Sequence, residues 1–213
     1  MSETSHPIGC VIMASGLARR FGSNKLLADF GGRPLLCRAL DATDTPQLAC
    51  RIVVTRSAEV ETLCQTLGVA CLRHALPGRN DTVRLGLEAL LTLQPGLAGC
   101  IFLPGDQPLL RRETVEALVC AFVADTRTQK ETERAIFRLA FQAENDPEPL
   151  VGSPVLFGCG YFSALRTLPE GKGGSVLLRR YPERVCNVFT ADRAELLDAD
   201  TPEALRGLKQ FLI

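Results

Sequence analysis

Short apolar runs alternate with segments of helical periodicity along most of the chain. Ile8–Ala14 is a nearly continuous apolar run that stops at Ser15-Gly16, which is typical of a strand buried on both faces of a parallel sheet. Further strands are expected at 51–55, 69–72, 99–103, 135–141, 154–157 and 185–189. Helices are expected at 34–40, 59–67, 82–93, 111–123, 162–168 and 202–212.

This alternation predicts an α/β fold of three layers, with helices on both faces of a mostly parallel, twisted sheet. We find no internal repeat, no low-complexity segment and no linker long enough to divide the chain. The expected organisation is therefore one domain over residues 1–213, with halves at 1–124 and 135–213. An exposed polar connection is expected between them, at 125–134.

Composition narrows the class of protein. The 213 residues carry 24 basic and 24 acidic side chains, so the chain lacks the basic surplus of a nonspecific nucleic-acid binder. The nine cysteines are odd in number and have no C-x-x-C spacing, which indicates reduced core cysteines and a reducing compartment. The polar N-terminus does not resemble a signal peptide, and no apolar stretch approaches the ~20 residues of a membrane helix. We expect a cytoplasmic protein without a membrane partner.

A loop of small and basic residues follows the first strand. Small residues, namely Ala14, Ser15 and Gly16, let the backbone approach a ligand, and successive N–H groups in such a turn bind anions. Three cations follow, namely Arg19, Arg20 and Lys25. Together they can neutralise a triphosphate, although a surface turn with solvated arginines is the alternative. The loop is neither a G-x-x-x-x-G-K-[ST] P-loop nor a G-x-G-x-x-G fingerprint, which disfavours a dinucleotide-dependent oxidoreductase.

Candidate acids lie at two places. Asp106 follows the buried run 99–103, and its carboxylate would emerge at the same sheet edge as the basic loop, where it could hold Mg²⁺. A helix cap is the competing role. Asp198 and Asp200 come late in the chain and could complete the metal site, with Asp200 ranked first, although Asp200-Thr201-Pro202 is also a good helix start.

The loop carries a family resemblance. Residues 13–27, MASGLARRFGSNKLL, resemble the pattern L-A-A-G-x-S-x-R-M-G-x-x-K-x-L of the sugar-nucleotide and cofactor nucleotidyltransferases. Arg20, Gly22 and Lys25 fall on its most specific positions. The continuation FGGRPLL at 30–36 resembles the family's G-x-P-L-L element. The chain differs from the pattern at Met13, Ser15, Ala18 and Phe21, and none of these differences removes a charge.

Later segments resemble the branch that attaches a nucleotide to molybdopterin. Asp106-Gln107-Pro108 resembles its D-Q-P motif, GSPVLF at 152–157 its G-H-P-V-L-F element, and GKGG at 171–174 its G-D-K-G element. Residues 198–203, DADTPE, resemble the family's closing D-I-D-T-P-E. Residues 78–87 resemble the element that touches the base in related cytidylyltransferases. Ser153 takes the place of the expected His, and Lys172 could meet the acceptor's phosphate or be a solvated loop lysine.

The resemblance implies a nucleotide-diphosphosugar-transferase fold, Mg²⁺ as cofactor, and transfer of CMP from CTP to a phosphate of molybdopterin with release of pyrophosphate. The implied catalytic residues are Lys25, Arg20 and Asp106, and the implied metal ligands are Asp106, Asp200 and Asp198. The implied nucleotide-binding residues are Ala14, Ser15, Gly16, Arg19, Gly22, Lys25, Asn80 and Thr82. Ser153 and Lys172 would bind the acceptor. Residues 1–124 would then hold the nucleotide, and residues 135–213 the acceptor.

Three questions stay open. CTP is favoured over GTP because Ser15 has a side chain, like the Ala of the CTP branch and unlike the Gly of the GTP branch. A methylerythritol phosphate cytidylyltransferase is the nearest alternative, supported by residues 80–84 and opposed by Asp106-Gln107-Pro108. A nucleotide-binding accessory protein that assists a molybdenum enzyme without turnover would keep every binding residue named above.

Overall fold

The computed structural model describes residues 6–16, 21, 24–128 and 135–212. Seven strands form one sheet in the order β3-β2-β1-β4-β6-β5-β7. Their bounds are β1 Ile8–Ala14, β2 Cys50–Thr55, β3 Cys71–Arg73, β4 Gly99–Pro104, β5 Ile136–Phe141, β6 Leu150–Gly158 and β7 Val185–Thr190. All adjacent strands pair in parallel except β6, which is antiparallel to both β4 and β5.

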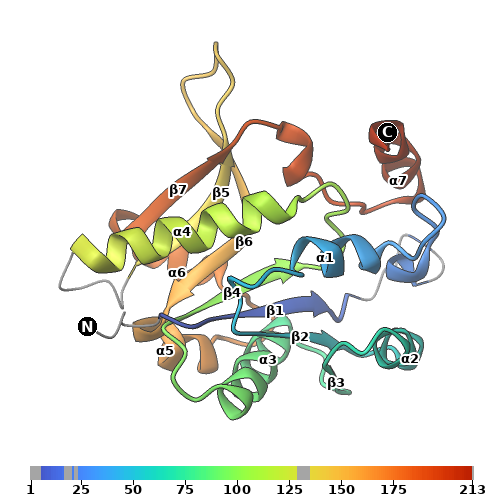
Figure 1. Cartoon of the computed structure of the whole chain (residues 1–213), viewed down its shortest axis with the longest axis horizontal. Coiled ribbons are helices and arrows are strands. Elements are labelled where there is room, and N and C mark those ends of the chain that lie inside the picture. Colours follow the sequence, from blue (N-terminus) through green and yellow to red (C-terminus); the bar gives the residue numbers. More distant parts are fainter. Residues whose placement is uncertain (1–5, 17–20, 22–23, 129–134, 213) are drawn as a thin grey trace.

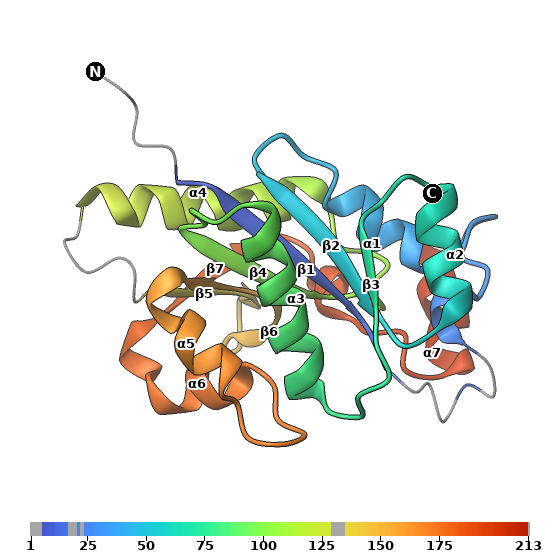
Figure 2. The same ribbon diagram turned by 90° about the horizontal axis from the view of Figure 1, so that it is seen from below.

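Helices cover both faces of this sheet, whose strands lie side by side from β7 to β3 in Figure 1. The α-helices are α1 Leu36–Ala42, α2 Ala58–Thr66, α3 Arg79–Leu93, α4 Arg112–Thr128, α5 Phe162–Arg166, α6 Ser175–Arg180 and α7 Pro202–Leu208. One face packs against α1, α2 and α4, and the other against α3, α5 and α6 (Figure 2). The predicted three-layer α/β fold with a mostly parallel sheet is confirmed. None of the described helices is long and apolar enough to cross a membrane.

The first strand explains why two layers of helices are needed. Ile8, Cys10 and Ile12 belong to the apolar cluster on the α1 and α4 face, whereas Val11 belongs to the cluster on the α3 face. All four side chains are fully buried. Because successive side chains of a strand point to opposite faces, a continuous apolar run needs cover on both sides. Burial of this kind supplies the main favourable term for folding.

Several predicted boundaries are wrong. The helix expected at 111–123 continues to Thr128, so the polar connection expected at 125–134 begins later. The strand expected at 154–157 is the longer β6, Leu150–Gly158, and α6 was not expected at all. The helix expected at 82–93 begins three residues earlier, at Arg79. The terminal helix expected at 202–212 is α-helical only to Leu208 and then tightens into a 3₁₀ turn.

In a small third apolar cluster, residues near the C-terminus pack against the segment that precedes α1. It is formed by Phe30, Leu35, Ala199, Leu205 and Leu208, all buried. An ion pair between Lys209 and Asp29, 3.0 Å, ties α7 to the same segment. Residues 198–200 are therefore carried back to the sheet edge where β1 and β4 end.

Two helical glycines predict opposite outcomes for the same substitution. A Cβ at Gly86 in α3 would lie 2.6 Å from Val11 Cγ1 and 3.0 Å from Val54 Cγ2, so Gly86→Ala is expected to destabilise the protein by about 1–3 kcal/mol. A Cβ at the exposed Gly207 in α7 would meet nothing within 4 Å, so Gly207→Ala should stabilise by about 0.4–1 kcal/mol. Denaturant unfolding measures both, and an unchanged midpoint for Gly86→Ala would contradict the close packing of α3 on β1.

Candidate active site at the ends of β1 and β4

The strand order reverses direction between β1 and β4. From β1 the chain proceeds to β2 and β3 on one side, and it then returns through α3 to β4 on the other side of β1. Ligands of open α/β sheets bind in the crevice at such a switch point, beyond the carboxyl ends of the strands. A cavity of about 940 Å³ lies at this position, with Met13 and Ser15 from the end of β1 and Pro104 and Asp106 from the end of β4 in its wall.

Lys25 is the central cation of this cavity. It opens a 3₁₀ turn, Lys25–Leu27, whose N-cap is Asn24, and the neighbouring Leu26 is buried in the core. The ammonium Nζ of Lys25 donates hydrogen bonds to Asp106 Oδ2 and, over 3.0 Å, to Asp200 Oδ1. Only 11% of its side chain is exposed, against 17% for Asp106 and 64% for Asp200. The positive charge of Lys25 is thus neutralised by two carboxylates that line the same cavity.

Backbone contacts bring the three acids together. Gly105 N–H donates to Met13 O over 3.0 Å, which extends the pairing of β1 and β4 by one step and leaves Asp106 just past the sheet. The N–H of buried Ala199 donates to Asp106 O over 2.9 Å. Asp198 and Asp200 flank Ala199, so this single hydrogen bond fixes both of them beside Asp106. All three acids line the cavity.

Burial and the concentration of charge together shift two pKa values. Desolvation of the Asp198 carboxyl, together with the negative charges of Asp106 and Asp200, raises its pKa to about 6. Burial opposes the charge on Lys25, but the hydrogen bonds and charges of Asp106 and Asp200 outweigh it and raise the pKa of the ammonium above its ordinary value. Lys25 is therefore charged at neutral pH, and the acids repel one another around it.

A neutral histidine contacts two hydroxyl residues that line the cavity. His74 Nε2 lies 3.0 Å from Ser15 Oγ and 3.4 Å from Thr82 Oγ1, and Ser15 Oγ also donates to Val54 O over 3.1 Å. Burial, with the positive charge of Arg56, lowers the pKa of His74, so the imidazole is uncharged at pH 7. Two hydroxyl residues expected at the nucleotide, Ser15 and Thr82, are joined through this ring.

Arg56 holds the start of the loop after β1. Its guanidinium donates twice to Ser15 O, once over 2.8 Å from Nε. It also reaches Pro77 O over 3.5 Å, next to the N-terminus of α3. The loop after β1 and the start of α3 are therefore fixed relative to one another before any ligand enters, which lowers the ordering cost of binding.

The structure brings together most of the predicted site residues that it describes. The larger cavity is lined by Ser15, Gly16, Lys25, Thr82, Asp106, Ser153, Asp198 and Asp200. Ala14 is instead buried at the end of β1. Asn80 accepts a hydrogen bond from Gly171 N over 2.9 Å and lies outside the lining. Lys172 is exposed and lines neither this cavity nor the adjoining one described below. Arg19, Arg20 and Gly22 lie outside the described residues.

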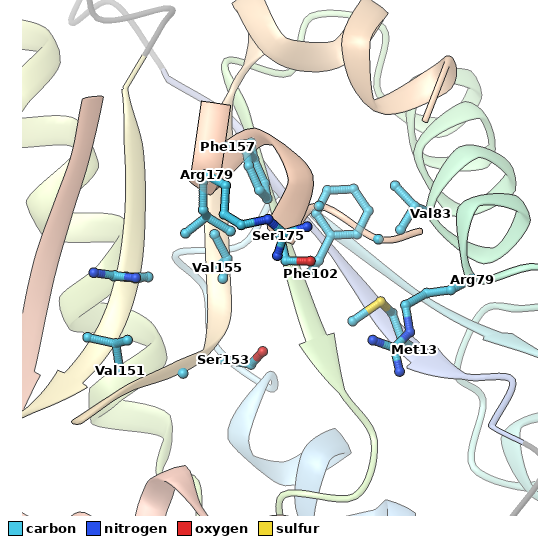
Figure 3. A pocket seen from close by; sticks show the side chains of 15 residues that line it. Met13, Arg79, Val83, Phe102, Val151, Ser153, Val155, Phe157, Ser175 and Arg179 are labelled. Atoms are coloured by element: carbon cyan, nitrogen blue, oxygen red, sulfur yellow. The ribbon is translucent and has the colours of Figure 1, made fainter. Parts of the chain in front are cut away.

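A second, smaller cavity of about 330 Å³ adjoins the first (Figure 3). Met13, Arg79 and Ser153 line both, so the two spaces share a boundary. Its wall is formed by β4, β5 and β6 on the sheet side and by α3 and α6 on the helix side. Figure 3 shows Phe102 of β4 and Val155 of β6 against Arg79 and Arg179 from the two helices.

Comparison with known proteins decides the family. Residues 10–185 match the model of the MobA-like NTP transferase domain, which covers most of the chain. The chain belongs to the MobA-like NTP transferase family. Residues 13–27, which carry the family resemblance, and Asp106 both lie inside the matched region.

Curated relatives of this NTP transferase domain match only part of the chain. The bifunctional protein GlmU of Anaeromyxobacter sp. (strain K) is 35% identical over 130 residues, 57% of this chain and 26% of that protein. A probable molybdenum cofactor guanylyltransferase of Pyrococcus horikoshii is 26% identical over 111 residues, 52% of this chain and 54% of that protein. The match thus spans about a quarter to a half of the relatives' own length.

Solved structures share the fold over nearly the whole NTP transferase chain. Rv0371c of Mycobacterium tuberculosis superposes with a TM-score of 0.75 at 22% identity, over 96% of this chain and 98% of that one. The same protein has also been solved with manganese, at a TM-score of 0.67 and 19% identity over 96% and 99% of the two chains. A CMP:2-keto-3-deoxy-manno-octonic acid synthetase complexed with CTP gives 0.70 at 16% identity, over 97% of each chain. At this identity these likenesses concern the fold.

Sequence reasoning missed Arg56, His74 and Gln107. Arg56 directly follows β2 and His74 directly follows β3, so both stand at the carboxyl end of a parallel strand. That position is the signal that also points to Ser15 and Asp106, and applying it to every strand finds all four. Gln107 is buried and hydrogen-bonds Asp198, which lowers the pKa of that acid and partly offsets the repulsion.

The raised pKa of Asp198 predicts a pH-dependent loss of stability. Its ordinary value is 3.8 and its folded value about 6, so between them the folded protein binds more protons than the unfolded chain. The contribution of Asp198 is therefore favourable below pH 4 and is lost as pH rises through 6. Asp198→Asn should remove this loss and stabilise the metal-free protein at pH 7.5 more than at pH 4.5. Denaturant unfolding at the two pH values measures it, and an equal effect at both would contradict the crowding of acids.

Proposed function

We propose that this protein is a Mg²⁺-dependent nucleotidyltransferase that moves CMP from CTP onto a phosphate of a molybdopterin-type acceptor and releases pyrophosphate. Membership of the MobA-like NTP transferase family supports the class of reaction. The observation that carries the proposal is the charged constellation of Lys25, Asp106 and Asp200 at the switch point of the sheet. The CTP and molybdopterin assignments rest on the motifs at Ser15, 106–108 and 152–157.

In the proposed reaction the protein mainly positions the two substrates and neutralises charge on their phosphates. An oxygen of the acceptor phosphate attacks the α-phosphorus of the nucleotide, the bond to the β-phosphate oxygen breaks, and pyrophosphate leaves with its electrons. An ionised phosphate needs no base to become a nucleophile, so no general base is assigned. Lys25 would neutralise charge that develops on the phosphates, and the backbone of Ser15 and Gly16 would offer N–H groups to the nucleotide. Arg19, Arg20 and Gly22 are proposed to assist in the same loop.

The carboxylates suit a magnesium ion that arrives with the nucleotide. Among the described residues no group of three or more His, Cys, Asp or Glu side chains is arranged to hold a metal by itself. Mg²⁺ is commonly bound by one or two carboxylates with substrate phosphates and water, which fits Asp106 with Asp200 or Asp198 in the lining of the larger cavity. When bound, the ion would polarise phosphate oxygens and neutralise their charge.

Recognition of the base is proposed for the wall at Ser15, His74 and Thr82. The Ser15 hydroxyl is held by Val54 O and His74 Nε2, so its position is determined before a base arrives. A side chain at this position is the feature that favours CTP in the motif comparison. Asn80, which is bound to Gly171 N, is proposed to act by tying the acceptor-side loop to α3. GTP is the alternative, supported by the guanylyltransferase relative.

Acceptor binding is proposed for Ser153, whose side chain lines both cavities, and for Lys172 on the neighbouring loop. An accessory protein that binds a nucleotide without turnover would present the same cavity. The two functions differ in a measurable way, because only the enzyme releases pyrophosphate when an acceptor is added.

Removing either member of the central ion pair, Lys25 or Asp106, should strongly reduce turnover. With CTP, Mg²⁺ and molybdopterin, Lys25→Met and Asp106→Asn are each expected to lower kcat/KM for pyrophosphate release by about 10²–10³-fold, because each removes a preorganised charge at the phosphates. A coupled pyrophosphate assay measures this, and EDTA should stop the wild-type reaction.

The matched control is Asp146→Asn, which removes an acid from the exposed loop between β5 and β6 and should leave turnover unchanged. Release with GTP alone would reject the CTP assignment and keep the reaction. Tight CTP binding without release in the wild type, with either molybdopterin or methylerythritol phosphate present, would reject the enzyme in favour of the accessory protein.

A further inference from the structure

The smaller cavity carries positive charge without compensation. Three arginines line it, Arg79, Arg138 and Arg179, and no acidic residue does. Among the residues that the structure describes, no carboxylate forms an ion pair with any of the three. The larger cavity is different, because its cation Lys25 bonds Asp106 and Asp200, and Asp198 lines the same cavity.

Arg138 is the most informative of the three. It lies on β5 with its guanidinium half-buried, and its Nε donates to the amide oxygen of Asn187 on β7 over 2.8 Å. Burial lowers the pKa of Arg138 below its ordinary value, although the group stays charged at neutral pH. A guanidinium offers five donors in a planar fork that matches a carboxylate, sulfonate or phosphate. The remaining donors of Arg138 are therefore suited to an anion inside the cavity.

The rest of the wall is apolar. Phe102 and Phe157 contact edge to face, with ring centroids 6.0 Å apart, and Val83, Val155 and Leu178 complete this surface. Glycine at 173 leaves room for Arg79, since a Cβ there would lie 2.8 Å from Arg79 Cδ. Figure 3 shows Arg79 from α3 beside Met13 and Arg179 from α6 near Ser175. Apolar walls with a few convergent charged groups are typical of small-molecule sites.

We propose that the smaller cavity binds an anionic group attached to an apolar or aromatic body, with Arg138 and Arg179 holding the anion and the Phe102 surface holding the body. This inference rests on the proposed function for one further step: the bound group is the part of the acceptor remote from the phosphate that receives the nucleotide. The acceptor would then carry anionic groups at two separate places.

The position of the cavity supports this assignment. Arg138 and Arg179 line only the smaller space, whereas Lys25 and the three acids line only the larger one. Ser153 and Arg79 stand at the shared boundary, so a molecule anchored in the smaller cavity would present its other end to the nucleotide. Lys172 lies outside both linings, which makes the arginines the better-placed cations for the acceptor.

The test uses two probes that differ only in charge. 8-Anilinonaphthalene-1-sulfonate has an aromatic body and one sulfonate, and N-phenyl-1-naphthylamine has the same body without the sulfonate. Fluorescence titration of the full chain should give saturable binding of the sulfonate. Its Kd should rise about 10-fold or more in Arg138→Gln and in Arg179→Gln, because each loses a charge-assisted hydrogen bond. The neutral probe should bind equally to all variants, and Arg138→Lys should retain part of the affinity.

Two controls make the outcome decisive. Arg166→Gln removes an exposed arginine of α5 that lines neither cavity, and should leave the sulfonate Kd unchanged. Arg179→Gln changes an exposed residue of α6, so a folding defect cannot explain its result. Sulfonate affinity that is equal in wild type, Arg138→Gln and Arg179→Gln, or that falls as much in Arg166→Gln, would overturn the inference.

Kinetics then separate this inference from the proposed function. The sulfonate should inhibit pyrophosphate release competitively with molybdopterin and not with CTP, and competition with CTP would overturn the acceptor assignment. If CTP does not bind the wild type at all, the proposed function fails, while the titration still tests the arginine site. If CTP binds and turns over but the arginine variants keep the acceptor KM unchanged, only the acceptor assignment fails.

Discussion

The site depends on one ammonium group placed among three carboxylates. Lys25 bonds Asp106 and Asp200, and these partners are 81 and 175 residues away along the chain. Without that cation, Asp106, Asp198 and Asp200 would face one another at a sheet edge, with Asp106 the most shielded of the three from water. Burial, together with the charges of Asp106 and Asp200, raises the pKa of the Asp198 carboxyl to about 6 even though Lys25 lies nearby. A nucleoside triphosphate with its metal ion would bring anionic phosphates to Lys25 and a cation to the three carboxylates.

The fold puts these distant residues together by a simple rule. Parallel strands β2, β1 and β4 end at one edge, so the first one or two residues after each strand gather there, as Arg56, Ser15 and Asp106 do. The antiparallel strand β6 enters the sheet beside β4 from the opposite direction and brings Ser153 to the same edge. The two cavities meet at Ser153. The larger one is lined by Lys25 and the three acids, and the smaller one is largely apolar with three arginines in its wall. That division matches a reaction with a nucleotide on one side and an acceptor on the other.

Much of this arrangement could be predicted from the sequence, for physical reasons that also define where prediction stops. Continuous apolar runs identified β1 and β4, and parallel strand ends then placed Lys25 and Asp106 at one edge. The antiparallel course of β6 has no comparable local signal. The short helix α6 has none either, because SVLLRR at 175–180 is too short to show a helical period. Arg138 and Arg179 could not be assigned, because isolated polar residues outside the strand ends gain meaning only from the segments packed against them.

One labelling measurement tests the central claim most directly. The wild type is incubated with Mg²⁺ and molybdopterin, and with CTP labelled either at the α-phosphorus or at the γ-phosphorus. Nucleotidyl transfer predicts that the α-label moves to the acceptor and the γ-label appears in pyrophosphate. Transfer of the γ-label to the acceptor, or release of the γ-label as inorganic phosphate while the α-label stays in free nucleotide, would contradict the account of the Lys25 and Asp106 site.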